Sequence, residues 1–176
     1  MLNLNIGKIR NIPGAKFPVK LSGEIDCATY GYQDKIAAGV VEFDGTAENA
    51  GQGVFSVNGQ YRGELLLQCS RCAERFAYQV KGIYDGEYLA ERLEQPDLFR
   101  EEPQRGFSGD TIDLTPALLE EIYLELPMQP LCREDCRGLC PICGINLNSN
   151  SCSCGRDDID PRWEKLKYLV DSKKGV

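Results

Sequence analysis

The sequence has no histidine in its 176 residues, which excludes catalysis by Ser-His or Cys-His pairs and metal binding through imidazole. It has no apolar run near the roughly 20 residues that cross a bilayer. Its first residues show no charged segment followed by an apolar one, the pattern of a secretory signal. We therefore expect a protein of the reducing cytoplasm, where disulfides are disfavoured.

Positive charge is also scarce. Lysine and arginine number 20 against 27 acidic residues, so the net charge is -7 at pH 7. General nucleic-acid binders carry a basic surface, and this composition argues against that class. An acidic surface is better matched to a basic protein partner. The length suits one domain, or one domain with a small appended module, and permits a hydrophobic core without disulfides.

Residues 1–84 show the alternation of apolar and polar side chains that predicts β-strands. Leu2, Leu4 and Ile6 alternate with polar residues, and the same pattern recurs further along the region. Asp44-Gly45 is a turn signal, and Asn58-Gly59 predicts a tight hairpin. We interpret this region as mainly antiparallel β-structure.

Residues 85–110 are rich in acidic residues and are interpreted as a solvated loop or linker. Residues 111–176 begin with a helix, for which Thr115 is the expected N-cap, Pro116 the first helical residue and Pro127 the stop. A second helix is expected from Pro161 to about Asp171. The prediction is an α+β fold with two helices and a C-terminal zinc-ribbon-like module, within one compact domain.

Cysteine is abundant, and six of the nine cysteines fall between Leu131 and Gly155, at Cys132, Cys136, Cys140, Cys143, Cys152 and Cys154. Cys140-Pro-Ile-Cys143-Gly144 has the form of a zinc knuckle. Two residues between the thiols allow one tight turn to place both on one ion, and a glycine after the second accepts positive φ. Four thiolates would close a structural zinc site with no open position.

The sequence does not decide which other cysteines complete this site. Cys152 and Cys154 are two positions apart, which in an extended strand means about 7 Å. We therefore expect one of them on a given zinc, preferably Cys154, together with Cys140, Cys143 and one of the pair Cys132 and Cys136. A two-metal cluster of all six cysteines is the alternative.

Cys69 and Cys72 lie between two predicted strands. They are interpreted as a second knuckle that completes another site with the cysteines left over, or as a free dithiol. Thioredoxin-like redox activity prefers such a pair at a helix N-terminus, so metal binding is favoured. An iron–sulfur cluster is an alternative to zinc. Cys27 is expected to be a small apolar filler.

Together these motifs resemble the YceD family: QCSRC in a β-region, an acidic stretch, a DLTP-capped helix and a long cysteine motif with a trailing C-x-C. The resemblance covers about Leu2 to Leu169. It implies a role in accumulation of large-subunit ribosomal RNA. Its motif positions in this chain are Cys69, Arg71, Cys72, Cys132, Cys136, Gly138, Leu139, Cys140, Cys143, Gly144, Asn146, Leu147, Asn148, Cys152 and Cys154.

Three functions are weighed. The first is a non-catalytic zinc-binding factor in ribosome biogenesis, whose partner is a ribosomal RNA precursor or a basic ribosomal protein. Arg71, Asn146 and Asn148 are its candidate partner contacts, with turn chemistry as the alternative for the two asparagines. The second is a metal-dependent RNA-processing enzyme, for which acids such as Asp110, Asp113, Glu120 and Glu121 are available. The third is a redox sensor built on the Cys69 and Cys72 dithiol.

Overall fold

The computed structural model describes residues 1–25, 31, 36–90 and 105–154. Its main element is a five-stranded sheet in the order β2-β3-β4-β5-β6. Strands β2, β3, β4 and β5 pair antiparallel with one another, and β6 pairs parallel with β5. The strands of this sheet are β2 (Lys16–Ile25), β3 (Ile36–Gly51), β4 (Val54–Gln68), β5 (Arg75–Ala90) and β6 (Arg105–Phe107).

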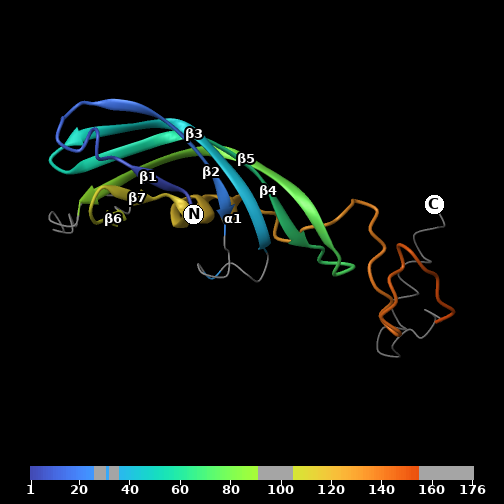
Figure 1. Ribbon diagram of the computed structural model, residues 1–176. Coiled ribbons are helices and arrows are strands. Elements are labelled where there is room, and N and C mark those ends of the chain that lie inside the picture. Colours follow the sequence, from blue (N-terminus) through green and yellow to red (C-terminus); the bar gives the residue numbers. More distant parts are fainter. Residues whose placement is uncertain (26–30, 32–35, 91–104, 155–176) are drawn as a thin grey trace, which may run out of the picture.

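A small second sheet and one helix cover one face of the main sheet. They are β1 (Asn3–Asn5), β7 (Thr111–Asp113) and α1 (Thr115–Glu125). Figure 1 shows these three elements together beneath the arch of the long strands. Strand side chains alternate between the two faces, so Phe43, Tyr61 and Leu65 are buried against the cover. The alternation at Leu2, Leu4 and Ile6 is confirmed, because all three are buried in this core.

Buried polar groups hold the N-terminal segment against both α1 and the main sheet. The backbone N–H of Leu2 donates to the hydroxyl of Thr115 at 2.8 Å. The buried Asn49 side chain on β3 donates to the carbonyls of Ile9 and Arg10 at 2.8 and 2.9 Å, and accepts from the N–H of Gly51 at 2.9 Å. Burying an amide is costly unless its hydrogen bonds are made, so Asn49 fixes the N-terminal segment beside the β3–β4 turn.

The predicted hairpin at Asn58-Gly59 is wrong, and so is the turn at Asp44-Gly45. Strands β3 and β4 run straight through both dipeptides, where Gly45 pairs with Gly59. The actual reversal is at residues 51–53, where Gln52 has a φ of 54°. Local turn preference was overridden by packing, because the two glycines face each other beneath the Phe43 ring.

Close approach explains this glycine pair. A Cβ atom on Gly59 would lie 2.5 Å from the carbonyl oxygen of Asp44 and 2.7 Å from Cζ of Phe43. A Cβ on Gly45 would lie 2.3 Å from the carbonyl oxygen of Asn58. Glycine within a strand marks such a site of close contact, so these residues make room for an aromatic ring rather than a turn.

The helix prediction is correct apart from its first residue. Leu114 is the N-cap and Thr115 the first helical residue, whose N–H donates to the Asp113 carboxylate at 2.9 Å. The helix ends at Glu125, before Pro127. Its buried side chains include Leu118, Leu119 and Ile122, which form one apolar stripe.

The α+β class with two helices is corrected. In the described ranges the chain has one helix and is mainly β. The helix predicted from Pro161 and the filler role of Cys27 lie outside the described residues. Of the predicted acidic linker, residues 85–90 belong to β5 and Arg105–Phe107 form β6.

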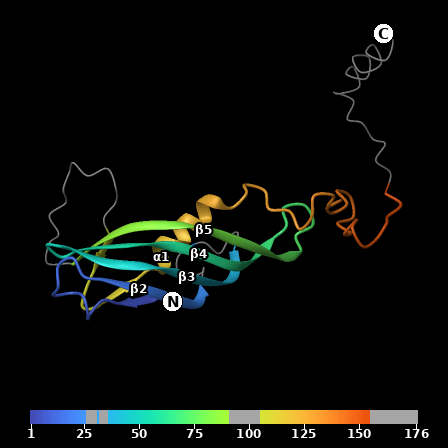
Figure 2. The same cartoon turned by 90° about the horizontal axis from the view of Figure 1, so that it is seen from above.

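After α1 the chain runs to the end of the sheet where the β4–β5 turn lies. In both Figure 1 and Figure 2 the orange cysteine-rich segment lies beyond that end of the sheet. This path brings Cys69 beside Cys136, 67 positions away, and Cys72 beside Cys132, 60 positions away. Within the described ranges, α1 falls short of the length and apolarity of a membrane-crossing helix.

Candidate metal centre

Four cysteines meet at the end of the sheet, and we call them group 1: Cys69, Cys72, Cys132 and Cys136. The first two lie in the turn between β4 and β5, as predicted, and the others follow α1. The Sγ atoms of Cys69 and Cys136 are 3.8 Å apart, and those of Cys72 and Cys132 are 3.7 Å apart. Three of the four side chains are buried, and Cys132 is half-buried.

Backbone hydrogen bonds hold the two halves of group 1 together. The N–H of Ser70 donates to the carbonyl of Pro130 at 2.8 Å, and the N–H of Leu139 donates to the carbonyl of Arg71 at 3.1 Å. The Arg71 guanidinium donates to the carbonyl of Cys136 at 3.0 Å. The turn is closed by the N–H of Ala73, which donates to the carbonyl of Cys69 at 2.9 Å.

The other four cysteines that the structure describes form group 2: Cys140, Cys143, Cys152 and Cys154. The N–H of Gly144 donates to the carbonyl of Cys140 at 2.9 Å, and Gly144 has a φ of 74°. This is the tight knuckle turn that the glycine predicted. Group 2 is built from one short stretch of chain, whereas group 1 joins two distant stretches.

Both groups fit a tetrahedral metal ion. In each, the four Sγ atoms all lie within 4.8 Å of one another. A zinc ion with Zn–S bonds of about 2.3 Å places its sulfur ligands about 3.8 Å apart, as observed for two pairs in group 1. These separations are far longer than a disulfide bond of about 2.05 Å. All eight cysteines are free thiols, and either group can hold a metal ion.

Electrostatics within each group favour a cation. Burial raises the pKa of Cys69, but N–H donors of the Cys132, Cys72 and Arg71 backbone lower it to about 6. In the same group, burial and the neighbouring thiol of Cys72 raise the pKa of Cys132 to about 12. Close thiols resist full ionisation because their thiolates repel one another.

Group 2 shows the same contrast. N–H donors of the Cys143 and Ile142 backbone lower the pKa of Cys140 to about 6. The neighbouring thiol of Cys143 and burial raise the pKa of Cys154 to about 12. A bound divalent cation would relieve the repulsion that keeps the last thiols protonated.

The structure groups the predicted ligands differently from the expectation. The favoured single-ion set took one member from each flanking pair, but the structure places Cys132 and Cys136 together with Cys69 and Cys72. We expected one of Cys152 and Cys154 at a given ion, whereas both belong to group 2. That expectation assumed an extended strand, whereas this stretch is irregular.

The three candidate partner contacts make contacts inside the chain. Arg71 binds carbonyls of the cysteine-rich segment. The Asn146 side chain accepts from the backbone N–H of Asn148 at 2.9 Å, and the Asn148 amide donates to Sγ of Cys136 at 3.3 Å. The bond between Asn146 and Asn148 is the turn chemistry expected as the alternative, whereas the bond from Asn148 to Cys136 was not foreseen from the sequence. Their role as partner contacts stays a prediction.

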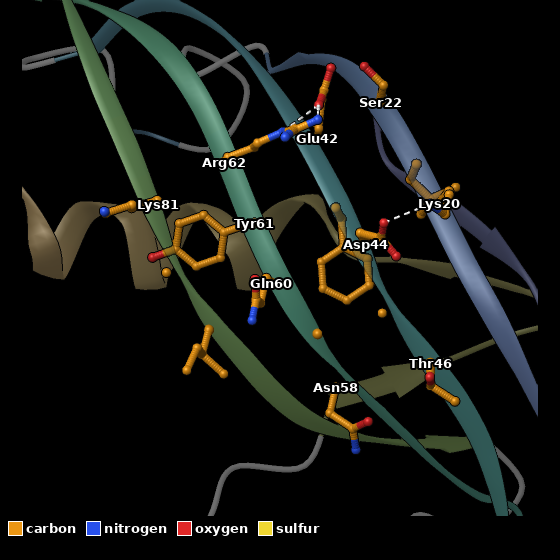
Figure 3. Close-up of a pocket in the computed structure, with 16 residues that line it drawn as sticks. Lys20, Ser22, Glu42, Asp44, Thr46, Asn58, Gln60, Tyr61, Arg62 and Lys81 are labelled. Atoms are coloured by element: carbon orange, nitrogen blue, oxygen red, sulfur yellow. Dashed lines mark hydrogen bonds and ion pairs between the residues drawn. The ribbon is translucent and has the colours of Figure 1, made fainter.

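A shallow hollow on the sheet is a weaker candidate site. Figure 3 shows it over β2 to β5, with α1 behind the strands. Four of its five charged side chains form two ion pairs: Lys20 with Asp44 at 2.9 Å and Arg62 with Glu42 at 2.6 Å. Mutually paired surface charges are the ordinary condition of a solvated strand face, and no function is assigned to this hollow.

An antiparallel sheet with eight thiols in two groups of four at one end defines a β-sheet protein with two candidate metal centres. The chain belongs to the family described as large ribosomal RNA subunit accumulation protein YceD, whose model matches residues 57–170. The matched region contains both cysteine groups. The resemblance seen in the motifs is therefore confirmed.

Three relatives illustrate the range of similarity. An uncharacterised protein of Mycobacterium tuberculosis H37Rv is 30% identical over 96% of this chain and 81% of its own length. The chloroplastic YCED homolog 1 of Arabidopsis thaliana, named a large ribosomal RNA subunit accumulation protein, is 25% identical over 68% of this chain and 46% of its own. Protein YlbN of Bacillus subtilis is 33% identical over 61% of this chain and 62% of its own. No solved structure matches the chain.

Proposed function

We propose that this chain is a non-catalytic, zinc-binding factor of the cytoplasm that supports accumulation of large-subunit ribosomal RNA. The observation that carries the proposal is that the region matched by the YceD family model contains both groups of four thiols. The family description supports the process. The sulfur geometry supports a structural role, with one zinc ion proposed in each group.

The donor sets favour a structural metal over a catalytic one. Catalytic zinc sites keep a position open for water or substrate, whereas four thiolates fill a tetrahedral site. Three of the acids considered for an RNA-processing enzyme are engaged elsewhere. Asp110 pairs with Arg10, Asp113 accepts from the helix N-terminus, and Glu120 pairs with Arg105.

Charge favours a basic protein as the direct partner. A zinc ion with four thiolates carries two net negative charges, so two such centres add to the net charge of -7. Beside these centres two apolar side chains are exposed: Ile142 at 65% and Leu139 at 41%. A cationic segment with apolar side chains, as in a ribosomal protein, complements this surface, and electrostatics disfavour direct contact with RNA phosphates.

Substitution at the tip of the knuckle tests the partner class. Ile142→Lys removes an apolar contact and adds a positive charge facing a basic partner, so crosslinking to ribosomal protein in cell extract should fall strongly. Ile83→Lys makes the same change on the sheet, at a side chain 75% exposed, and should leave crosslinking unchanged. Capture of precursor RNA without a protein bridge would contradict this partner assignment.

The cellular role is tested by deleting the gene in its host and measuring the ratio of large- to small-subunit ribosomal RNA. The ratio should fall and be restored by the wild-type gene. Variants with Cys136→Ser or Cys140→Ser should restore it less well at equal protein level. Elemental analysis of purified protein should give two zinc ions per chain. An unchanged ratio would contradict the function, and metal-free ordered protein would contradict the zinc assignment.

A further inference from the structure

The side chain of Asn148 contacts a ligand of the other group. Asn148 lies in the loop of group 2, between Cys143 and Cys152. Its amide Nδ2 nevertheless lies 3.3 Å from Sγ of Cys136, a member of group 1. The residue thus joins the two candidate metal centres.

The orientation of the Asn148 amide is fixed by its other hydrogen bonds. Its Oδ1 accepts from the Arg133 guanidinium and from the backbone N–H of Arg137, both at 2.8 Å. Nδ2 donates to Oδ1 of Asn146 at 2.9 Å. Guanidinium and backbone N–H groups are donors alone, so turning the amide over would set donor against donor. Nδ2 must therefore face the sulfur of Cys136.

Backbone contacts hold Asn148 in this place. The N–H of Leu147 donates to the carbonyl of Gly138 at 2.9 Å, and Leu139 and Asn146 form an antiparallel bridge. The N–H of Cys140 donates to the carbonyl of Ile145 at 2.8 Å. The loop between Cys143 and Cys152 is thus folded back onto residues 138–140, which connect group 1 to group 2. The shape of this loop decides whether Asn148 reaches Cys136.

We propose that Asn148 couples the two metal centres: binding of an ion by group 2 orders its loop and sets the Asn148 amide on Cys136, which tightens binding of an ion by group 1. The inference rests on the proposed zinc binding and adds to it. An N–H donated to a thiolate stabilises the charged ligand. Because coupling between binding sites is reciprocal, an ion in group 1 tightens binding in group 2 by the same factor.

The expected change in metal affinity can be taken from other side chains that hydrogen-bond to a metal ligand. Loss of a side chain that holds a metal ligand in place commonly weakens metal affinity by about 10- to 100-fold. Asn148→Asp keeps the shape and the acceptor that faces Arg133 and Arg137, but removes the donor and sets a carboxylate against Cys136. It should weaken metal binding by group 1 by about that factor.

The experiment uses the full chain, with Co²⁺ as probe and its sulfur-to-metal absorption as readout. Cys143→Ser with Cys154→Ser deletes group 2 and leaves group 1 to be titrated against a chelator. Group 1 should then bind Co²⁺ about 10- to 100-fold more weakly than in the wild-type chain. Asn148→Asp should weaken group 1 by a similar factor in the wild-type background and produce little further loss when group 2 is deleted.

Asn150→Asp is the matched control, because it makes the same charge change at an exposed residue whose amide contacts Ser149. It should leave group 1 unchanged. Equal weakening by Asn148→Asp in both backgrounds, or equal affinity of group 1 with and without group 2, would overturn the coupling. Either result still shows metal binding, whereas absence of Co²⁺ binding in the wild-type chain would overturn the zinc assignment itself.

Discussion

The Sγ atom of Cys69 lies 3.8 Å from the Sγ atom of Cys136, 67 positions further along the chain. A metal ion in group 1 would therefore fasten the cysteine-rich segment to the end of the sheet, whereas one in group 2 would shape the segment locally. Structural zinc supplies folding free energy, on the order of 10–16 kcal/mol in finger peptides. The two centres should consequently respond differently to loss of a ligand.

Loss of a group 1 ligand should release the segment from the sheet. In Cys136→Ser, trypsin should cleave after Arg133 and Arg137 much faster than in the wild-type chain, because docking then depends on a few hydrogen bonds. Cys154→Ser should expose these sites less, since group 1 keeps its four ligands. Ser149→Ala serves as the control. Equal cleavage rates in Cys136→Ser and the wild type would contradict the docking role.

Two glycines in the segment should differ in their tolerance of alanine. Both have a φ of 74°, but a Cβ on Gly138 would lie 2.9 Å from the carbonyl oxygen of Arg71, while one on Gly144 has nothing within 4 Å. The left-handed conformation costs alanine about 1–2 kcal/mol at either position. Gly138→Ala adds a clash with the acceptor of the Leu139 N–H, so chelator should remove metal from it faster than from Gly144→Ala. The reverse order would contradict this account.

The glycine pair beneath Phe43 should be essential to the sheet. Gly59→Ala sets a methyl group 2.6 Å from Cα of Gly45, and overpacking of this kind costs about 1–3 kcal/mol. The midpoint of urea unfolding should fall accordingly. Asn58→Ala, at the neighbouring exposed position, should change it little. If both variants unfold at the same midpoint, close packing does not explain the pair.

Part of this structure could be predicted from the alternation of apolar and polar residues and from the cysteine motif. Alternation identified the buried Leu2, Leu4 and Ile6, and the knuckle motif identified the turn at Gly144. The turn reading of Asn58-Gly59 failed because a dipeptide preference carries no information about an aromatic ring on the same strand. Phe43 explains why the strands continue here. It lies two positions from Gly45 on β3 and needs the space that both glycines leave.

The pairing of the cysteines was beyond local reasoning. Spacing identifies which thiols can share a turn, but Cys132 and Cys136 find their partners through the path of the chain from α1 to the β4–β5 turn. That path is set by packing of α1 on the sheet. Asn148 was noticed in the motif as a surface contact, whereas its hydrogen bond to Cys136 depends on how the loop folds back.

The hydroxyls of Tyr84 and Tyr88 form a buried hydrogen bond of 2.8 Å on β5. Tyr84→Phe or Tyr88→Phe alone should lower the free energy of unfolding by about 1–3 kcal/mol, because each leaves a buried hydroxyl without its partner. The double variant should lose less than the sum of the two. Urea unfolding of all four proteins at pH 7 measures the cycle, and additive losses would contradict the pairing.

Tyr84 and Tyr88, together with Tyr61, should make the fold sensitive to alkali. Burial raises the pKa of Tyr88, of Tyr84 and of Tyr61 above the ordinary value. A raised pKa means that the folded state holds protons which the unfolded chain loses near pH 10. Their contribution is therefore complete below about pH 10 and is lost as the pH rises above it. Urea midpoints measured from pH 8 to 11 should fall at the upper end, and less steeply in the double Tyr84→Phe, Tyr88→Phe variant. A fall of the same steepness in both proteins would show that this pair is not the cause.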